Sequence, residues 1–189
     1  MSTAATVDGA PRGGGASTEQ RVLIVGVGNV LRGDDMFGVE VARRLLELDL
    51  PPSVQVIETG IAGISLVQEL LDGYDALLII DAVERQRPPG TLVMLEPRVP
   101  DPSEMSETDR REFFADLHQA DPSRGLMLAK ALGCLPPRVL ILGCEVGDCE
   151  ELLVDLTPAV RAALPTAVEM VVETLHGWLR GDGPLEVSA

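Results

Sequence analysis

The sequence predicts an α/β fold, a three-layer α/β/α sandwich whose twisted sheet has about five strands, mostly parallel, and one antiparallel hairpin strand. Short apolar runs rich in Val, Leu and Ile alternate along the chain with longer segments of helical periodicity. Such runs are typical of parallel strands that helices cover on both faces. Hydrophobic residues form 46% of the 189-residue chain and aromatic residues only 3%, so the core is expected to be aliphatic.

The first half of the chain is expected to hold three strands and two helices. The β-branched run RVLIVGV predicts the first strand. A helical spacing of apolar residues after Asp35 predicts the first helix, which Pro51 ends. The expected strands are Arg21–Val27, Val54–Ile57 and Ala76–Ile80, and the expected helices are Phe37–Leu48 and Ile64–Leu71.

The second half begins with the link Ala82–Gly90, which is too short for a parallel crossover of about a dozen residues or more. Thr91–Glu96 is therefore expected to pair antiparallel, as a hairpin partner. Pro97–Gln119 is polar and irregular, with a helical turn expected around Arg110–Asp116. The remaining expected elements are a helix over Pro122–Leu132, a strand over Val139–Cys144, and a last helix from Thr157 to about Leu179. Pro165 lies inside that helix and is expected to kink or divide it.

One domain is expected over residues 21–180, with a flexible N-terminal tail over residues 1–20 and a C-terminal tail over residues 181–189. No apolar stretch reaches the ~20 residues of a membrane helix, and the N-terminus does not resemble a signal peptide. Three cysteines without a CxxC pair argue against a disulfide framework or a closed zinc site. We expect a cytoplasmic protein with no membrane partner, and a monomer, because nothing demands a large apolar interface.

The charge of the chain bears on its partners. The formal net charge is −15, and the sequence contains no strong basic patch. Binding to a phosphate backbone needs clustered Lys and Arg. Nucleic acid is therefore not expected as a partner, and the acidic surface mainly favours solubility.

Acidic residues gather where the predicted strands end, and ligands bind outside the carboxyl ends of strands in open α/β sheets. These residues are Asp34, Asp35, Glu58, Asp81, Glu145 and Asp148. Simpler roles remain open on spacing alone. Asp34 or Asp35 could cap the following helix. Asp81 follows an apolar run and could be held by structural hydrogen bonds, because a buried unpaired carboxylate is costly.

The chain has two histidines, His118 and His176. His176 lies near the end of the last helix and is expected at the surface, close to the helix C-terminus. His118 lies in a polar loop and, taken alone, is expected to be exposed to solvent. With two carboxylates, however, one imidazole makes a coherent ligand set for nickel or zinc. Open positions on such a metal can polarise a carbonyl or activate water.

The glycine pair in the run GVG after the first strand raises a different possibility, a dinucleotide-binding protein. Leu31 replaces the third glycine of that fingerprint, although Glu58 could mimic its ribose-binding acid. Asp34 and Asp35 would lie where the pyrophosphate binds and would repel it. Dinucleotide binding therefore ranks below a metal or peptide site.

The segment VLIVGVGNVLRGDDMFG, residues 22–38, resembles the opening motif of the [NiFe]-hydrogenase maturation endopeptidases: a strand, G-x-G-N-x-L, a pair of acids and a glycine. Further family-like segments follow in order: the glycine turn ETGIAG, the strand with Asp81 and its P-G-T turn, His118 before a Leu/Ala-rich helix, and VLILG with Glu145. The resemblance spans roughly residues 22–175. Met36 stands where the family often has glycine. Glu58 and Ile61 replace the usual aspartate and threonine.

The resemblance implies an endopeptidase that removes a C-terminal extension from the hydrogenase large-subunit precursor after nickel insertion. It implies that Asp35, Asp81 and His118 contact the metal and carry the reaction, with aspartate at the first position where many members have glutamate. The nickel is expected to belong to the precursor and to be bound transiently, without an organic cofactor. Asp34 would cap the first helix or assist beside the site. A member that binds the precursor without cutting it is the alternative.

Overall fold

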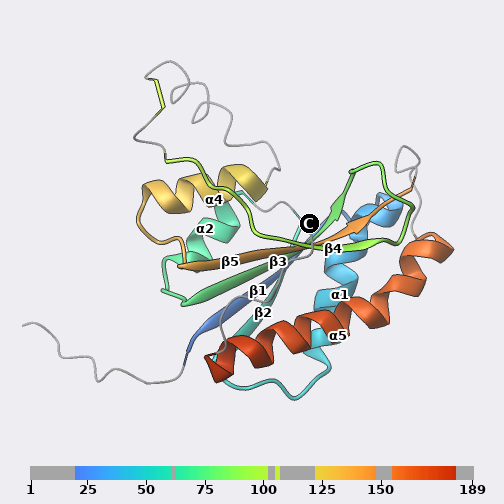
Figure 1. The fold of residues 1–189 in the computed structure, drawn as a ribbon, viewed down its shortest axis with the longest axis horizontal. Helices are drawn as coiled ribbons and strands as arrows, with labels where there is room; N and C mark the ends of the chain where they lie inside the picture. The colour runs from blue at the N-terminus through green and yellow to red at the C-terminus, as the bar shows by residue number, and fades with distance from the viewer. Residues whose placement is uncertain (1–19, 61–62, 102–104, 107–121, 148–154, 182–189) are drawn as a thin grey trace, which may run out of the picture.

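A five-stranded sheet with the strand order β2-β1-β3-β5-β4 forms the centre of the protein (Figure 1). The computed structural model describes residues 20–60, 63–101, 105–106, 122–147 and 155–181. The strands are β1 (Val22–Val27), β2 (Val54–Thr59), β3 (Ala76–Val83), β4 (Leu92–Leu95) and β5 (Arg138–Glu145). All neighbours pair parallel except β4, which is antiparallel to β5. The predicted mostly parallel sheet with one antiparallel strand is confirmed.

Helices cover both faces of the sheet, as predicted (Figure 1). The helical segments are the short 3₁₀ helix η1 (Gly33–Met36), α1 (Phe37–Leu46), α2 (Ile64–Leu70), α4 (Pro122–Ala131) and α5 (Pro158–Arg180). α1 and α5 pack on one face, and α2 and α4 on the other. Each face of the sheet has its own hydrophobic core, and alternate residues of β1 belong to one or the other. Val22 and Ile24 lie in the core with α1 and α5, whereas Leu23 and Val25 lie in the core with α2 and α4. This double burial explains the continuous apolar runs.

The antiparallel strand does not form a hairpin with β3, and that expectation was wrong. β5 lies between the two, so β4 pairs with β5 from Leu92 opposite Cys144 to Leu95 opposite Ile141. β5 is largely buried and belongs in the interior of the sheet. The four-residue β4 is short and is soon followed by Pro97. Such a strand suits an edge position.

Two further expectations need correction. β3 continues through Asp81 to Val83, which pairs with Glu145, so Asp81 lies within the strand and not after it. α5 runs without division past Pro165. Pro165 is exposed, so water can bind the carbonyl group that loses its N–H partner there. His176 is exposed, as predicted.

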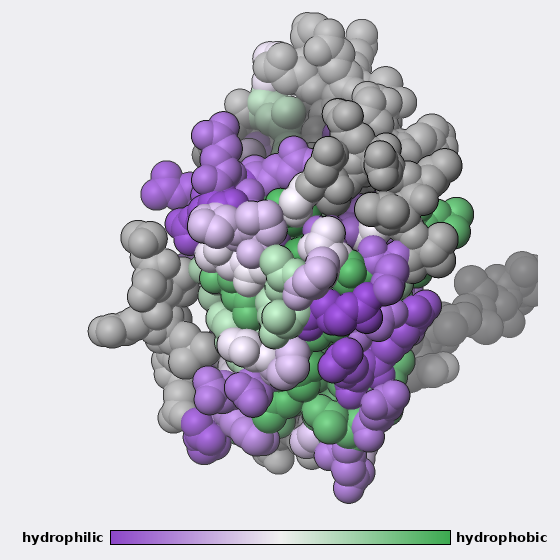
Figure 2. All heavy atoms as spheres, turned by 90° about the vertical axis from the view of Figure 1, so that its right-hand side faces the viewer, coloured by the Kyte–Doolittle hydropathy of each residue, from purple (hydrophilic) through white to green (hydrophobic). Residues whose placement is uncertain are grey.

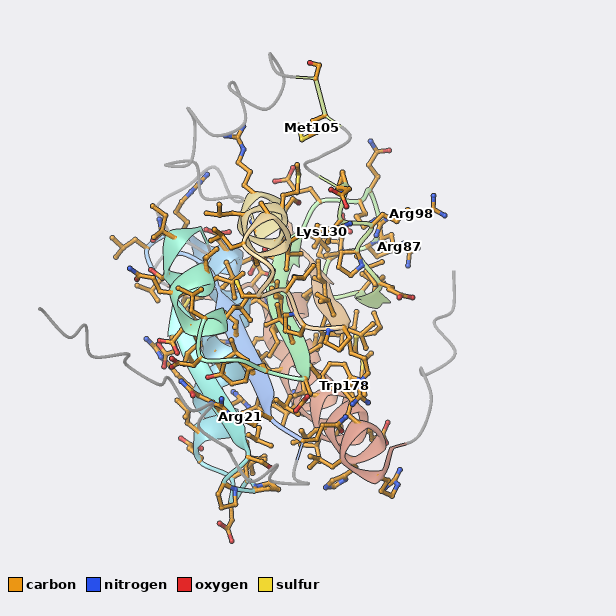
Figure 3. The ribbon with its side chains drawn as sticks, turned by 90° about the vertical axis from the view of Figure 1, so that its left-hand side faces the viewer. Arg21, Arg87, Arg98, Met105, Lys130 and Trp178 are labelled. Carbon is orange, nitrogen blue, oxygen red and sulfur yellow. The ribbon has the colours of Figure 1, made fainter. Side chains whose placement is uncertain are left out.

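Figure 3 faces the amino end of the sheet, where Arg21 and Trp178 make stabilising contacts. The Arg21 guanidinium donates hydrogen bonds to the carbonyl oxygens of Asp72 and Gly73 and lies 4.6 Å from the centroid of the Tyr74 ring. The buried Trp178 anchors the end of α5. In the part of the chain that is described, no helix combines the length and apolarity needed to cross a membrane. The predicted tails and the helical turn at Arg110–Asp116 lie outside the described residues, except for residues 20 and 181.

Candidate active site

The loop after β1 folds back so closely that only glycine fits at Gly28. A Cβ atom there would lie 1.9 Å from the carbonyl oxygen of Asp35, and the φ angle of +148° also favours glycine. The backbone of Asp35 therefore rests directly against the end of β1. This contact accounts for the second glycine of the opening motif.

The first turn of α1 rests on the ends of two strands. A Cβ atom at Gly38 would lie 2.1 Å from the carbonyl oxygen of Ile80 in β3 and 2.3 Å from that of Val27 in β1. η1, directly before α1, also contacts β3. Asp35 on η1 and Asp81 on β3 thus come from elements that pack together at the carboxyl edge of the sheet. Asp35 thus lies on the turn after β1, whereas Asp81 lies inside β3, two residues before that strand ends.

The two carboxylates have local hydrogen bonds and are only partly buried. The Asn29 backbone N–H donates to Oδ2 of Asp35 over 3.2 Å, and Asn29 Oδ1 accepts from the Leu31 N–H over 3.0 Å. The Ala82 N–H donates to Oδ1 of Asp81 over 2.8 Å. Partial burial orients each carboxylate and leaves it within reach of a ligand, which is the situation that metal contact requires.

Asp34 has a different environment, because only 1% of it is exposed. Its Oδ1 accepts the Thr157 N–H over 2.7 Å, and its Oδ2 accepts the Thr157 hydroxyl over 2.9 Å and the Gly147 N–H over 3.2 Å. The first helix has no side-chain cap. The expectation that Asp34 caps α1 was therefore wrong, since the carboxylate binds the start of α5 instead.

Glu145 is a second buried carboxylate, 4% exposed, at the end of β5. Both of its oxygens accept the Arg85 N–H, over 2.8 and 3.0 Å, which ties the β3–β4 connection to β5. Its neighbour Cys144 is fully buried. Burial, followed by the charges of Asp34 and Glu145, raises the pKa of Cys144 to about 12. The thiol stays protonated at neutral pH and is no candidate nucleophile.

A pocket of about 470 Å³ opens at the ends of β1 and β2, lined by Gly28, Asn29, Val30, Val39, Glu58 and Gly60. Asn29 both lines this pocket and donates to Asp35, so the pocket lies beside that carboxylate. Glu58 is paired with Arg43 through a 3.2 Å contact, and its charge is the main cause of the raised pKa of Arg43. Val30, which lines the pocket, is 38% exposed, and the next residue, Leu31, is 59% exposed. Figure 2 faces this end of the sheet and shows hydrophobic surface bordered by strongly hydrophilic side chains.

The predicted third residue, His118, lies outside the described residues, as does Asp148. Within the described ranges no group of three acidic, His or Cys side chains is placed to hold a metal ion. Asp35 and Asp81 together could supply two oxygen ligands, and the role of His118 stays a prediction. Two features of the site had no sequence signal: the Asn29 N–H that orients Asp35, and the contact of Asp34 with Thr157, which lies 123 positions away.

The fold and the site define a class: an α/β protein with two aspartates on contacting elements, and glycine turns, at the carboxyl edge of its sheet. The sequence profile described as "Hydrogenase maturation protease" matches residues 39–174. That match begins after the glycine motif and after Asp35, so it recognises the chain independently of them. The protein belongs to the hydrogenase maturation protease family, a family of peptidases.

Relatives and solved structures agree with this assignment. The hydrogenase expression/formation protein HupD of Rhizobium leguminosarum is 31% identical over 163 residues, which cover 84% of this chain and 75% of HupD. The hydrogenase 2 maturation peptidase of a Thaumarchaeota archaeon has a TM-score of 0.60 at 34% identity, covering 83% of this chain and 99% of its own. The hydrogenase maturating endopeptidase HybD of E. coli has a TM-score of 0.65 at 28% identity, covering 84% and 93%.

Proposed function

We propose that this protein is an endopeptidase that removes the C-terminal extension of a [NiFe]-hydrogenase large-subunit precursor after nickel insertion. The observation that carries the proposal is the placement of Asp35 and Asp81 on contacting elements at the carboxyl edge of the sheet, beside a pocket, in a chain of the maturation protease family. The names of the relatives connect the family with hydrogenase formation and with peptidase activity. Cleavage is expected in the cytoplasm.

In the proposed reaction, Asp35, Asp81 and His118 contact the nickel ion that the precursor carries. Carboxylate and imidazole ligands suit this metal and leave coordination positions open. The nickel orients the scissile amide or polarises its carbonyl, and a water molecule attacks the carbonyl carbon. The C–N bond then breaks, and the leaving amine takes up a proton. Because the metal belongs to the substrate, cleavage would report that nickel loading is complete.

The pocket next to Asp35 is suited to a peptide segment. Val30 in its lining offers partly exposed apolar surface, with the exposed Leu31 next to it in the chain, and Gly28 and Gly60 also line it. A precursor segment that binds here would bring its backbone past Asp35. Binding energy from such remote contacts helps to orient the scissile bond for reaction.

The test is incubation of the purified protein with candidate large-subunit precursors, with and without nickel, followed by intact-mass measurement. We expect a single loss of mass from the nickel-loaded precursor alone. Asp81→Ala should abolish this loss, whereas Glu84→Ala, which changes an exposed acid just after β3, should leave it unchanged. Binding of nickel-loaded precursor without shortening would contradict the proposed activity and favour a chaperone role.

A further inference from the structure

Asp34 brings together three segments that are far apart in the chain. It lies on η1, after β1, and it accepts hydrogen bonds from Gly147, just after β5, and from Thr157, at the start of α5. An ionised carboxylate only accepts hydrogen bonds, and here three donors converge on its two oxygens. This buried acid has no part in the proposed chemistry, so its role calls for another explanation.

The position of Asp34 on η1 links it to Asp35. A 3₁₀ helix has about three residues per turn, so consecutive side chains point roughly 120° apart. Asp34 accordingly points into the protein and Asp35 toward the carboxyl edge, where the Asn29 N–H holds it. The Asp35 N–H is itself bonded to the Arg32 carbonyl, over 3.1 Å, within the same turn. A shift of Asp34 would therefore move Asp35 with it.

The partners of Asp34 link this turn to β5, the strand that pairs with the Asp81-bearing β3. Gly147 follows β5, and β5 pairs with β3 so that Gly143 lies opposite Asp81. Thr157 begins α5, which contacts β5. The three hydrogen bonds of Asp34 thus fix the backbone of η1 against the same sheet region that positions Asp81.

We propose that Asp34 is a positioning residue for the cleavage reaction: its hydrogen bonds to Thr157 and Gly147 hold Asp35 at the separation from Asp81 that metal contact requires. This inference rests on the proposed function. Functional groups at a metal site must be held within roughly 0.5 Å of the productive geometry. A misplacement of about 1 Å can lower a rate by about 100-fold. A carboxylate that is anchored at two distant segments supplies this precision.

A merely structural role for Asp34 would predict only a loss of stability. A matched pair of threonine variants separates that role from the positioning role. Thr157→Val removes the hydroxyl that donates to Asp34, and Thr157→Ser retains it. Thr174→Val is the control, because Thr174 is a buried threonine of the same helix whose hydroxyl donates to the Met170 carbonyl over 2.7 Å. Thr157→Val and Thr174→Val each remove one hydroxyl that donates a hydrogen bond, and thermal unfolding would report the stability of each.

Cleavage of nickel-loaded precursor at saturating concentration should be about tenfold slower for Thr157→Val and about 100-fold slower for Asp34→Asn, with KM changed less than about twofold. Thr157→Ser and Thr174→Val should cleave at the wild-type rate once the folded fraction is taken into account. Equal rates for Thr157→Val and Thr174→Val would overturn the inference. That comparison decides the question even if Asp34→Asn does not fold.

Amide hydrogen exchange gives a second measurement that needs no precursor. Thr157→Val should accelerate exchange at Asn29 and Asp35, and Thr174→Val should not. Unchanged exchange at both amides in Thr157→Val would overturn the inference. A wild-type protein that cuts no precursor would instead refute the proposed function, and the exchange data would still show whether Asp34 holds Asp35 in place.

Discussion

Replacing Gly38 with alanine should destabilise the protein, although alanine is the better helix former. Glycine to alanine in a helix interior normally gains about 0.5–1 kcal/mol. Here the added Cβ would lie 2.1 Å from the Ile80 carbonyl oxygen and 2.3 Å from that of Val27. These are backbone atoms of two central strands and cannot rotate away. Overpacking of this kind typically costs about 1–3 kcal/mol. The upper end of that range, less the gain in helix propensity, gives an expected net loss of about 2 kcal/mol in the free energy of unfolding.

Urea denaturation of Gly38→Ala beside Gly177→Ala provides the measurement. Gly177 also lies in a helix, and a Cβ atom there would meet nothing within 4 Å. We expect Gly177→Ala to be as stable as the wild type or slightly more stable. Gly38→Ala should unfold at a lower urea concentration and should also cleave precursor more slowly, because α1 carries η1 and Asp35 with it. A Gly38→Ala protein as stable as Gly177→Ala would refute the argument that α1 is seated directly on β1 and β3.

Three further predictions concern the end of β5. Glu145→Gln should lower the free energy of unfolding by about 1–3 kcal/mol, because it weakens a buried acceptor of the Arg85 N–H. The control Glu84→Gln, at an exposed position, should change that free energy by less than about 0.5 kcal/mol. Equal effects of the two variants in denaturation would contradict this prediction. Peptide mapping after iodoacetamide treatment should find Cys144 unmodified in the native protein and modified after denaturation, since the thiol is fully buried. The folded-state pKa of Cys144, about 12, lies above the ordinary thiol value of 9.0. The contribution of this thiol to stability is therefore complete below about pH 9 and is lost as the pH rises toward 12. Cys144→Val should lose less stability over this range than the wild type, and an equal loss would count against the raised pKa.

The fold was largely predictable because its strands are continuous apolar runs and its helices have regular spacing. The strand that pairs with the antiparallel strand β4 was not predictable, because the order of strands in the sheet depends on which strand is buried on both faces. The short link after Asp81 correctly indicated an antiparallel strand, but β5 enters between β3 and β4. The extension of β3 past Asp81 was missed for a similar reason, since its pairing with Glu145 is a contact between distant segments.

The site, too, was predictable only in part. The location of Asp35 and Asp81 at the carboxyl edge followed from the alternation of strands and helices. The function of Asp34 did not follow, because capping a helix and binding a helix 123 positions later leave the same local pattern. The choice of Asp35 over Asp34 as the metal-contacting residue came from the family resemblance. It agrees with the burial, since Asp34 is enclosed and Asp35 only partly so.

The most direct test of the proposed metal contacts is anomalous diffraction at the nickel edge from crystals soaked with Ni²⁺. We predict a peak between the carboxylates of Asp35 and Asp81 and the imidazole of His118, lost in Asp35→Ala and kept in Asp49→Ala, which alters an exposed acid after α1. Nickel bound only elsewhere, such as at His176, with none between Asp35 and Asp81, would contradict the assignment.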